Sequence, residues 1–300
     1  MQQTIHTSKV FIFPIITLGL LVLNLQVFYN VFGEPISDLQ IIFIDVGQGD
    51  STLIIMPNGK SVLIDGGERS MGNIVLSTLQ QHGISKLDVM VATHPHRDHI
   101  AGLIPVMSTI EVGQVLDSGQ QPTTQVFEDY LDTIEVQGIP FRVVHAGETL
   151  GLDSRVTMEI LNPPSPLLLG TNDDISNNSI VVKLTYGNFS AMFPGDITEI
   201  AEESLLGEDL DVDVLLAAHH GSRNSNSIGF LNAATPEAVI VYAGLNNRYG
   251  HPNQESIDRI NSSGVNHIFI TYEDGTITLT TNGETATIET ARSGRMITIP

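Results

Sequence analysis

The most informative segment of the chain reads Thr93-His94-Pro95-His96-Arg97-Asp98-His99, and it places three histidines and one aspartate within six positions. It follows the mostly apolar run 87–92, which predicts a buried strand that ends at this segment. Alternate side chains of an extended backbone point to the same side, so His94 and His96 can hold one cation. The chain then turns toward a short helix near Ile100, so Asp98 and His99 leave in another direction. The spacing therefore predicts a site for two metal ions, and the alternative is an exposed polar loop.

The composition limits the chemistry that such a site can use. The chain of 300 residues contains no cysteine, so any metal must be held by nitrogen and oxygen ligands. It carries 34 acidic and 13 basic residues, a net charge of −21, which should repel nucleic acid unless bound metal and local basic residues offset it. Two divalent cations would add about four positive charges where the substrate lies. The acidity therefore counts against tight, processive DNA binding without excluding a hydrolase of phosphodiesters.

The N-terminal segment predicts the location of the protein. Residues 10–33 carry no charge and are numerous enough to span a bilayer. Lys9 before this segment and Glu34 after it indicate an N-terminus inside the cell and a chain exported beyond the membrane. We expect a membrane anchor in residues 1–33; a cleaved signal peptide with Val31 and Gly33 at the cleavage site is the alternative. In both cases the remaining chain faces outward.

Residues 38–300 alternate strand-like and helix-like segments without a clear boundary, which predicts one α/β domain. Early hairpin-like pairs followed by strand and helix alternation in each half predict two packed sheets with helices outside. The expected fold is a four-layer αββα sandwich. The expected strands are 40–46, 52–56, 61–64, 88–93, 114–116, 142–144, 156–161, 179–184, 190–193, 212–218, 238–242 and 267–271. The expected helices are 73–81, 126–134, 199–206 and 254–261.

Two aspartates follow expected strands directly. Asp65 precedes Gly66 and Gly67, and it could orient a metal-binding histidine or cap the following loop. Asp196 follows the strand 190–193. A carboxylate has two oxygens and can bridge two cations, so we expect Asp196 to be a bridging ligand, with a helix cap as the alternative.

Further imidazoles lie in the second half of the chain. His219 and His220 end the apolar strand 212–218, and adjacent residues of an extended chain point opposite ways. Only one of them should then reach the metals; we expect His219 to be the ligand and His220 to support it or contact substrate. His251 lies in a loop rich in asparagine and glycine, where it could act as an acid or oxyanion donor, or merely belong to a helix-capping loop.

These motifs resemble the metallo-β-lactamase fold, and specifically the extracellular domain of the ComEC competence and DNA-uptake family. The likeness covers about residues 39–279. It rests on the Val46-Gly47-Gln48-Gly49-Asp50 opening, Asp65-Gly66-Gly67, the 93–102 signature, Pro194-Gly195-Asp196, His219-His220-Gly221-Ser222 and Tyr249-Gly250-His251-Pro252. The channel-forming membrane domain of that family has no counterpart here, so we do not expect this chain alone to transport DNA.

The resemblance implies a role for each matching residue. The implied metal ligands are His94, His96, Asp98, His99, Asp196 and His219. Gln48, Asp50 and Asn178 are expected to lie near the site, where they would support the ligands or contact substrate, and Asn178 stands in the segment where many relatives supply another histidine. Without that histidine the first metal lacks one nitrogen, so the metal could be zinc, which we favour, or manganese.

The resulting hypothesis is a hydrolase with two divalent metals and a metal-bridging hydroxide, oriented by Asp98 and Asp196 and assisted by His251. The expected substrate is a phosphodiester, with extracellular DNA as the leading candidate. A phosphocholine-type ester, or another ester or lactone, is the alternative for the same site. A non-catalytic envelope binding module is the alternative of another class, and it predicts no metal or no turnover.

Overall fold

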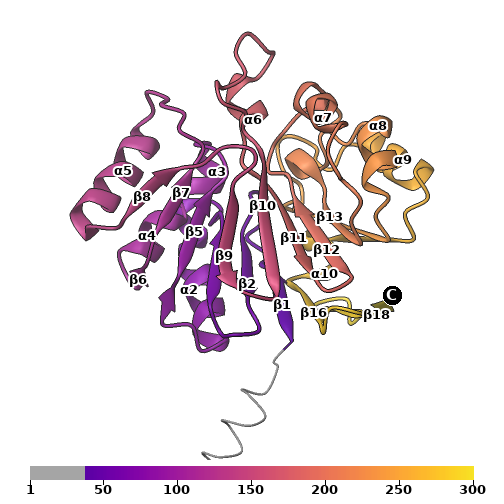
Figure 1. Ribbon diagram of the computed structural model, residues 1–300, viewed down its shortest axis with the longest axis horizontal. Coiled ribbons are helices and arrows are strands. Elements are labelled where there is room, and N and C mark those ends of the chain that lie inside the picture. The colour runs from indigo at the N-terminus through magenta and orange to yellow at the C-terminus, as the bar shows by residue number, and fades with distance from the viewer. Residues whose placement is uncertain (1–37) are drawn as a thin grey trace, which may run out of the picture. The chain divides into compact units, whose positions relative to one another are not determined.

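Residues 38–300, which the computed structural model describes, form two β-sheets that face each other, with helices on both outer sides (Figure 1). Helices α2 (Gly72–Gln81), α4 (Leu103–Met107) and α5 (Gln125–Gln137) flank one sheet, and α7 (Glu199–Leu205), α8 (Ile228–Ala234) and α9 (Gln254–Ser262) flank the other. These residues form one compact unit. The predicted α/β class and the four-layer αββα sandwich are confirmed.

The first sheet has nine strands in the order β18-β17-β16-β1-β2-β3-β5-β7-β8. Its strands are β1 (Leu39–Phe43), β2 (Thr52–Ile55), β3 (Ser61–Ile64), β5 (Val89–Ala92), β7 (Val115–Asp117), β8 (Phe141–Val143), β16 (Ile277–Thr281), β17 (Ala286–Thr290) and β18 (Met296–Ile299). The strands from β18 to β3 pair antiparallel, whereas β3, β5, β7 and β8 pair parallel. A further pair, β4 (Lys86–Leu87) and β6 (Glu111–Val112), forms a small parallel ladder.

The second sheet has seven strands in the order β15-β14-β13-β12-β11-β10-β9. Its strands are β9 (Thr149–Asp153), β10 (Val156–Asn162), β11 (Val181–Tyr186), β12 (Phe189–Phe193), β13 (Val214–Leu216), β14 (Ala238–Val241) and β15 (His267–Ile270). The strands from β12 to β15 are parallel. Short helical turns complete the chain: η1 (Arg69–Met71), α3 (Arg97–Ile100), α6 (Asp174–Asn177), η2 (Ala218–Gly221) and α10 (Thr271–Asp274).

Three apolar clusters hold the four layers together, and strand periodicity produces them. On β3, Val62 and Ile64 face the cluster between the sheets, while Leu63 faces the cluster beneath α2 and α4. On β11, Val182 faces the central cluster and Val181 the cluster beneath α7 and α8. A strand covered on both faces needs apolar residues at successive positions, which explains why these strands appear in the sequence as continuous apolar runs.

Two glycines allow the loops at one edge of the sandwich to approach closely. A Cβ on Gly102 would lie 1.8 Å from the carbonyl oxygen of Gly66, and one on Gly49, which has a φ of +123°, would lie 2.3 Å from the carbonyl oxygen of Asp98. Only glycine fits such contacts. The loops after β1, β3 and β5 are therefore pressed together where the site forms.

The sequence did not reveal every element. Strands β9, β16, β17 and β18 were not predicted, and the last three extend the first sheet beyond β1. The predicted anchor or signal segment 1–33 lies outside the described residues. Within residues 38–300 no helix has the length and apolarity needed to cross a membrane.

Candidate metal centre

The candidate site lies at the edge where loops from both sheets meet. The loop after β5 supplies residues 93–99, the loop after β12 supplies Asp196, and the turn after β13 supplies His219 and His220. Strand β5 lies in a parallel part of the first sheet, and β12 and β13 pair parallel in the second, so the carboxyl ends of the strands in each group lie at one edge. Residues more than 100 positions apart in sequence are thereby brought together.

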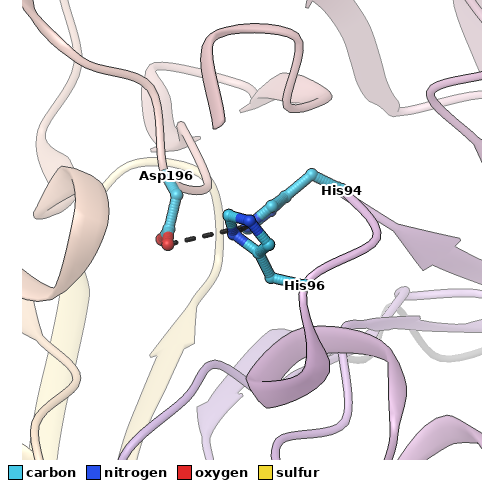
Figure 2. A group of neighbouring side chains, drawn as sticks. All are labelled: His94, His96 and Asp196. Atoms are coloured by element: carbon cyan, nitrogen blue, oxygen red, sulfur yellow. Dashed lines mark hydrogen bonds and ion pairs between the residues drawn. The ribbon is translucent and has the colours of Figure 1, made fainter. Parts of the chain in front are cut away.

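The first group of potential metal ligands consists of His94, His96 and Asp196, whose ligand atoms all lie within 4.8 Å of one another. Figure 2 shows the two imidazoles reaching from the loop after β5 toward the carboxylate on the opposite loop. His94 Nε2 lies 3.6 Å from Asp196 Oδ2 and 2.9 Å from His96 Nδ1. The alternation predicted for His94 and His96 thus places both rings beside one carboxylate.

The second group consists of Asp98, His99 and His220. His220 Nε2 lies 3.5 Å from Asp98 Oδ2 and 3.7 Å from Asp196 Oδ1, and His99 Nε2 lies 3.4 Å from Asp196 Oδ2. Asp50 lies behind this group, with its Oδ1 3.1 Å from His220 Nδ1. Asp196 therefore lies between the two groups, which is the position that a bridging carboxylate requires.

Asp65 fixes the orientation of His99 through the ring nitrogen Nδ1, which lies on the side of the ring away from Asp196. Its Oδ2 accepts hydrogen bonds from the Thr93 hydroxyl at 2.6 Å and from His99 Nδ1 at 2.8 Å, and its Oδ1 accepts one from the Thr93 amide at 2.9 Å. In the neutral ring this bond keeps the proton on Nδ1, so that Nε2, which faces Asp196, carries the lone pair that a cation can bind. Of the two roles considered for Asp65, the geometry matches orientation of a histidine.

The turn that carries His219 and His220 corrects one premise of the sequence reasoning. Both residues adopt left-handed conformations, with φ of 53° and 55°, so the pair is not extended. Both rings consequently face the site: His219 Nε2 lies 3.6 Å from Asp196 Oδ2, and His220 is almost fully buried beside Asp98. The expectation that only one imidazole reaches the site is therefore wrong, because alternation applies only to extended backbone.

The charges of the site are set by burial and by mutual contact. Burial lowers the pKa of His94 well below its ordinary value, which keeps the imidazole neutral and able to bind a cation. Burial alone would raise the pKa of Asp196, but the neighbouring imidazoles of His219, His99 and His220 hold it well below its usual range. The carboxylate of Asp196 is therefore ionised at neutral pH.

An open cavity of about 730 Å³ leads from solvent to this cluster. Gln48 and His251 line it together with the ligand candidates. Burial, followed by the charges of His220 and His219, lowers the pKa of His251 to about 4, so its ring is neutral at pH 7. The Nε2 amide of Gln48 is buried and makes no hydrogen bond within residues 38–300, so it is free to bind a ligand.

Asn178 does not take part in the site, contrary to its predicted place there. Its Oδ1 accepts a hydrogen bond from the Leu168 amide, and its Nδ2 donates to the carbonyls of Leu168 and Asp174. The side chain of Asn178 therefore closes the loop between β10 and β11 and does not face the metal ligands.

The arrangement fits divalent metals. Within residues 38–300, His99 Nε2, His220 Nε2 and Asp196 Oδ1 are buried and lack hydrogen bonds. Unpartnered buried polar atoms are costly, yet these atoms converge with the spacing that metal ligands adopt. Imidazole and carboxylate together suit zinc or manganese. The residues present could therefore hold two cations that share Asp196.

Two supporting residues escaped the sequence reasoning. Thr93 binds Asp65 through both its amide and its hydroxyl. Asn226 holds the histidine turn, since its Oδ1 accepts from the Ala218 amide and its Nδ2 donates to the Ala218 carbonyl. Thr93 could have been suspected from its place at the end of β5, whereas nothing in the segment around Asn226 distinguishes it from an ordinary polar loop.

An αββα sandwich with a histidine and aspartate cluster between its two sheet edges defines a class, the metal-dependent hydrolases with a metallo-β-lactamase fold. The chain belongs to the metallo-beta-lactamase superfamily, whose family model matches residues 44–244.

The curated relatives connect the chain to competence proteins. It is 26% identical over 260 residues to ComE operon protein 3 of Bacillus subtilis, covering 80% of this chain and 33% of that protein. It is 27% identical over 241 residues to competence protein ComA of Neisseria gonorrhoeae, covering 79% and 32%. The chain thus spans about a third of the length of these relatives. The resemblance to the competence family is confirmed at this level of identity.

A solved structure supports the fold. YhfI of Bacillus subtilis, a metallo-beta-lactamase fold protein, matches with a TM-score of 0.54 at 11% identity, covering 87% of this chain and 100% of that one. Similarity at this identity concerns the fold alone. Substrate and mechanism must be argued from the site.

Proposed function

We propose that residues 38–300 form a metal-dependent phosphodiesterase that cleaves nucleic acid, with DNA as the leading substrate. The observation that carries the proposal is Asp196, whose two oxygens are surrounded by the imidazoles of His94, His99, His219 and His220. Hydrogen bonding alone does not explain this set, because several of its buried atoms have no partner within residues 38–300. The similarity to competence proteins supports a nucleic-acid substrate.

Metals bound in this cluster would activate water and stabilise charge on a phosphoryl oxygen. The protein's own groups divide the remaining tasks. Asp65 holds His99 in one tautomer, and Asp50 contacts His220 on the side away from Asp98. The carboxylates of Asp98 and Asp196 accept hydrogen bonds from the attacking water and orient it. His251 is neutral at pH 7 and therefore acts by donating a ring N–H to a substrate or leaving-group oxygen.

The experiment compares three proteins begun at Asp38: the parent, the Asp98→Ala, His99→Ala double variant, and a His82→Ala, Asp132→Ala control. The control removes the same residue types outside the candidate ligand groups. Metal content is measured alongside hydrolysis of bis(p-nitrophenyl) phosphate, single-stranded DNA and p-nitrophenyl phosphocholine. We expect the parent and the control to bind about two metals and to cleave bis(p-nitrophenyl) phosphate and DNA in preference to p-nitrophenyl phosphocholine, and the double variant to lose both metal and turnover.

Other results would overturn parts of the proposal. Preference for the phosphocholine ester would change the substrate class while leaving the hydrolase intact. A parent that binds no metal under any loading condition would support the non-catalytic binding module. Metal binding without turnover of any of the three substrates would contradict the phosphodiesterase and direct the search to carboxylic esters and lactones.

The proposed location is outside the cytoplasm. The uncharged segment 10–33, between Lys9 and Glu34, supports export through an anchor or a cleaved signal peptide. Protease treatment of intact cells that carry a C-terminally tagged chain tests this proposal. Digestion of the tag, or its release into the medium, is expected; a tag that becomes sensitive only after lysis would contradict export.

A further inference from the structure

Two arginines lie at the mouth of the cavity that leads to the metal centre. The residues that line this cavity within the described chain include Arg97 and Arg248 but no lysine and no other arginine. The whole sequence has only 13 basic residues against 34 acidic ones. A pair of guanidinium groups at one opening is therefore a local exception to a strongly negative molecule, and it creates a positive rim around an anion-accepting site.

Arg97 is only partly engaged by its neighbours. It begins helix α3, beside the ligand candidates, and its side chain is 70% exposed. Its Nε donates a hydrogen bond to Glu68 at 2.7 Å. A guanidinium has five N–H donors, so the bond to Glu68 aligns the group while its terminal nitrogens remain available to a ligand.

Arg248 is held by aromatic stacking. Its guanidinium carbon lies 4.7 Å from the centre of the Tyr249 ring, and it donates a hydrogen bond to the Tyr249 hydroxyl. Tyr249 in turn stacks on His251 at 5.6 Å and 21°, and His251 stacks on His220 at 6.0 Å. This row runs from the metal centre outward. Two rings separate Arg248 from His220, so Arg248 lies beyond the reacting group and faces the next part of a bound substrate.

The centre of the cavity is negative, whereas its rim carries two positive side chains. Near the centre the carboxylates of Asp98 and Asp196 repel a phosphate unless cations lie between them. At the rim Glu68 is paired with Arg97, whereas Arg248 makes no ion pair within residues 38–300, although the charges of Asp98 and Glu68 act on it from farther away. The rim therefore attracts an anion by itself, whereas the centre needs metal to do so.

We infer that Arg97 and Arg248 together bind a phosphate that flanks the scissile phosphodiester of a nucleotide chain. Guanidinium groups bind phosphate through paired N–H donors and remain charged at every physiological pH. The inference rests on the proposed function, since it names the second phosphate of a substrate for the same site. Under this inference the protein recognises two phosphates joined through a sugar. Such a pair is present in nucleic acid and absent from esters with a single phosphate.

The test measures binding, because binding can be read without turnover. The ligands are adenosine 5′-phosphate, adenosine 3′,5′-bisphosphate and adenosine 5′-diphosphate, which share one nucleoside and differ in the second phosphate. Calorimetry is performed on the metal-loaded and the chelator-treated protein. The variants are Arg97→Gln, Arg248→Gln and their combination. The control is Arg142→Gln, which removes one positive charge elsewhere on the surface. Arg142 lies on the edge strand β8 and is paired with Glu148.

We expect the parent and the control to bind the 3′,5′-bisphosphate about tenfold more tightly than the monophosphate, a ratio typical of one charge-assisted contact. The combined variant should reduce this ratio to less than twofold, and each single variant should reduce it in part. The preference should persist without metal, because the arginines and not the metals produce it.

Three results would overturn the inference. The first is a parent with no preference for the bisphosphate, and the second is a combined variant that keeps the parent's ratio. The third is tighter binding of the 5′-diphosphate than of the 3′,5′-bisphosphate, which would indicate a phosphoanhydride ligand. Turnover of bis(p-nitrophenyl) phosphate by the parent is scored separately. If the parent shows no turnover but keeps the arginine-dependent ratio, the phosphodiesterase proposal is contradicted, whereas phosphate binding by Arg97 and Arg248 is supported.

Discussion

Replacement of Asp65 by asparagine should weaken metal binding while leaving the fold intact. Asp65 is fully buried, and its Oδ2 accepts hydrogen bonds from both Thr93 Oγ1 and His99 Nδ1. Asparagine has the same shape and tolerates the φ of 57° found here. It places an NH2 group where Oδ2 lies. The Thr93 hydroxyl can rotate to accept a bond, whereas the Nδ1–H of His99 meets a second donor and must move its proton to Nε2.

The magnitude follows from the bond that is lost. A hydrogen bond to a charged group contributes ~1.5–3 kcal/mol. Every 1.4 kcal/mol is about tenfold in affinity, so the substitution should weaken metal binding ~10–100-fold, as removal of a ligand-orienting carboxylate typically does. The loss should concentrate on the metal that His99 helps to bind, because His99 belongs to the candidate groups Asp98, His99, His220 and Asp50, His99, Asp196 but not to His94, His96, Asp196.

Competition between the protein and a chromophoric chelator for zinc measures the affinity of each site. The matched control is Asp117→Asn, since Asp117 is a buried aspartate at the end of β7 in the same sheet and belongs to none of the candidate metal groups. Nitrogen NMR of the histidine rings reports the tautomer of His99 independently of metal. Parent-like zinc affinity in Asp65→Asn, or a His99 that stays protonated at Nδ1, would refute the reasoning.

Three further outcomes are expected. Asn226→Ala should lower the free energy of unfolding by ~3 kcal/mol in urea titrations, because it leaves the buried amide and carbonyl of Ala218 without their partners; unchanged metal affinity in that variant would show that the histidine turn holds without Asn226. Burial raises the pKa of Asp117 from 3.8 to about 6, so its contribution to stability is complete below pH 3.8 and is lost, by ~3 kcal/mol, as the pH rises through 6. Asp117→Asn should therefore gain stability relative to the parent between pH 4 and pH 7, and a difference that stays constant across this range would contradict the assignment. Removal of metal by a chelator should lower the thermal midpoint reversibly, since a ligand at 100 times its dissociation constant stabilises by ~2.7 kcal/mol; equal midpoints with and without added zinc or manganese would argue against a metal site.

The fold could be predicted where local pattern and burial agree. The loop after β5 was predicted because an apolar run ends in ligand-type residues, a signal contained within about ten positions. Strands β16, β17 and β18 lack that signal, since they are rich in threonine and have one covered face. Their place in the sheet depends on pairing across the chain, such as Leu39 opposite Thr281 on β1 and β16. Pairing at that separation leaves no local mark in the sequence.

The histidine turn shows why the site itself was harder to predict than the strands that carry it. A left-handed conformation costs a residue other than glycine ~1–2 kcal/mol, so local propensity disfavours it at His219 and again at His220. Distant contacts compensate for this cost: the His219 amide donates to the Gly195 carbonyl, and Asn226 is itself held by the buried carboxylate of Glu202. Each of these partners lies beyond the reach of a local pattern. Strain held by surrounding contacts is common where side chains must converge on one point. The left-handed pair lets two consecutive imidazoles face Asp196, which an extended strand could not do, so the departure from the local rule is what completes the candidate metal centre.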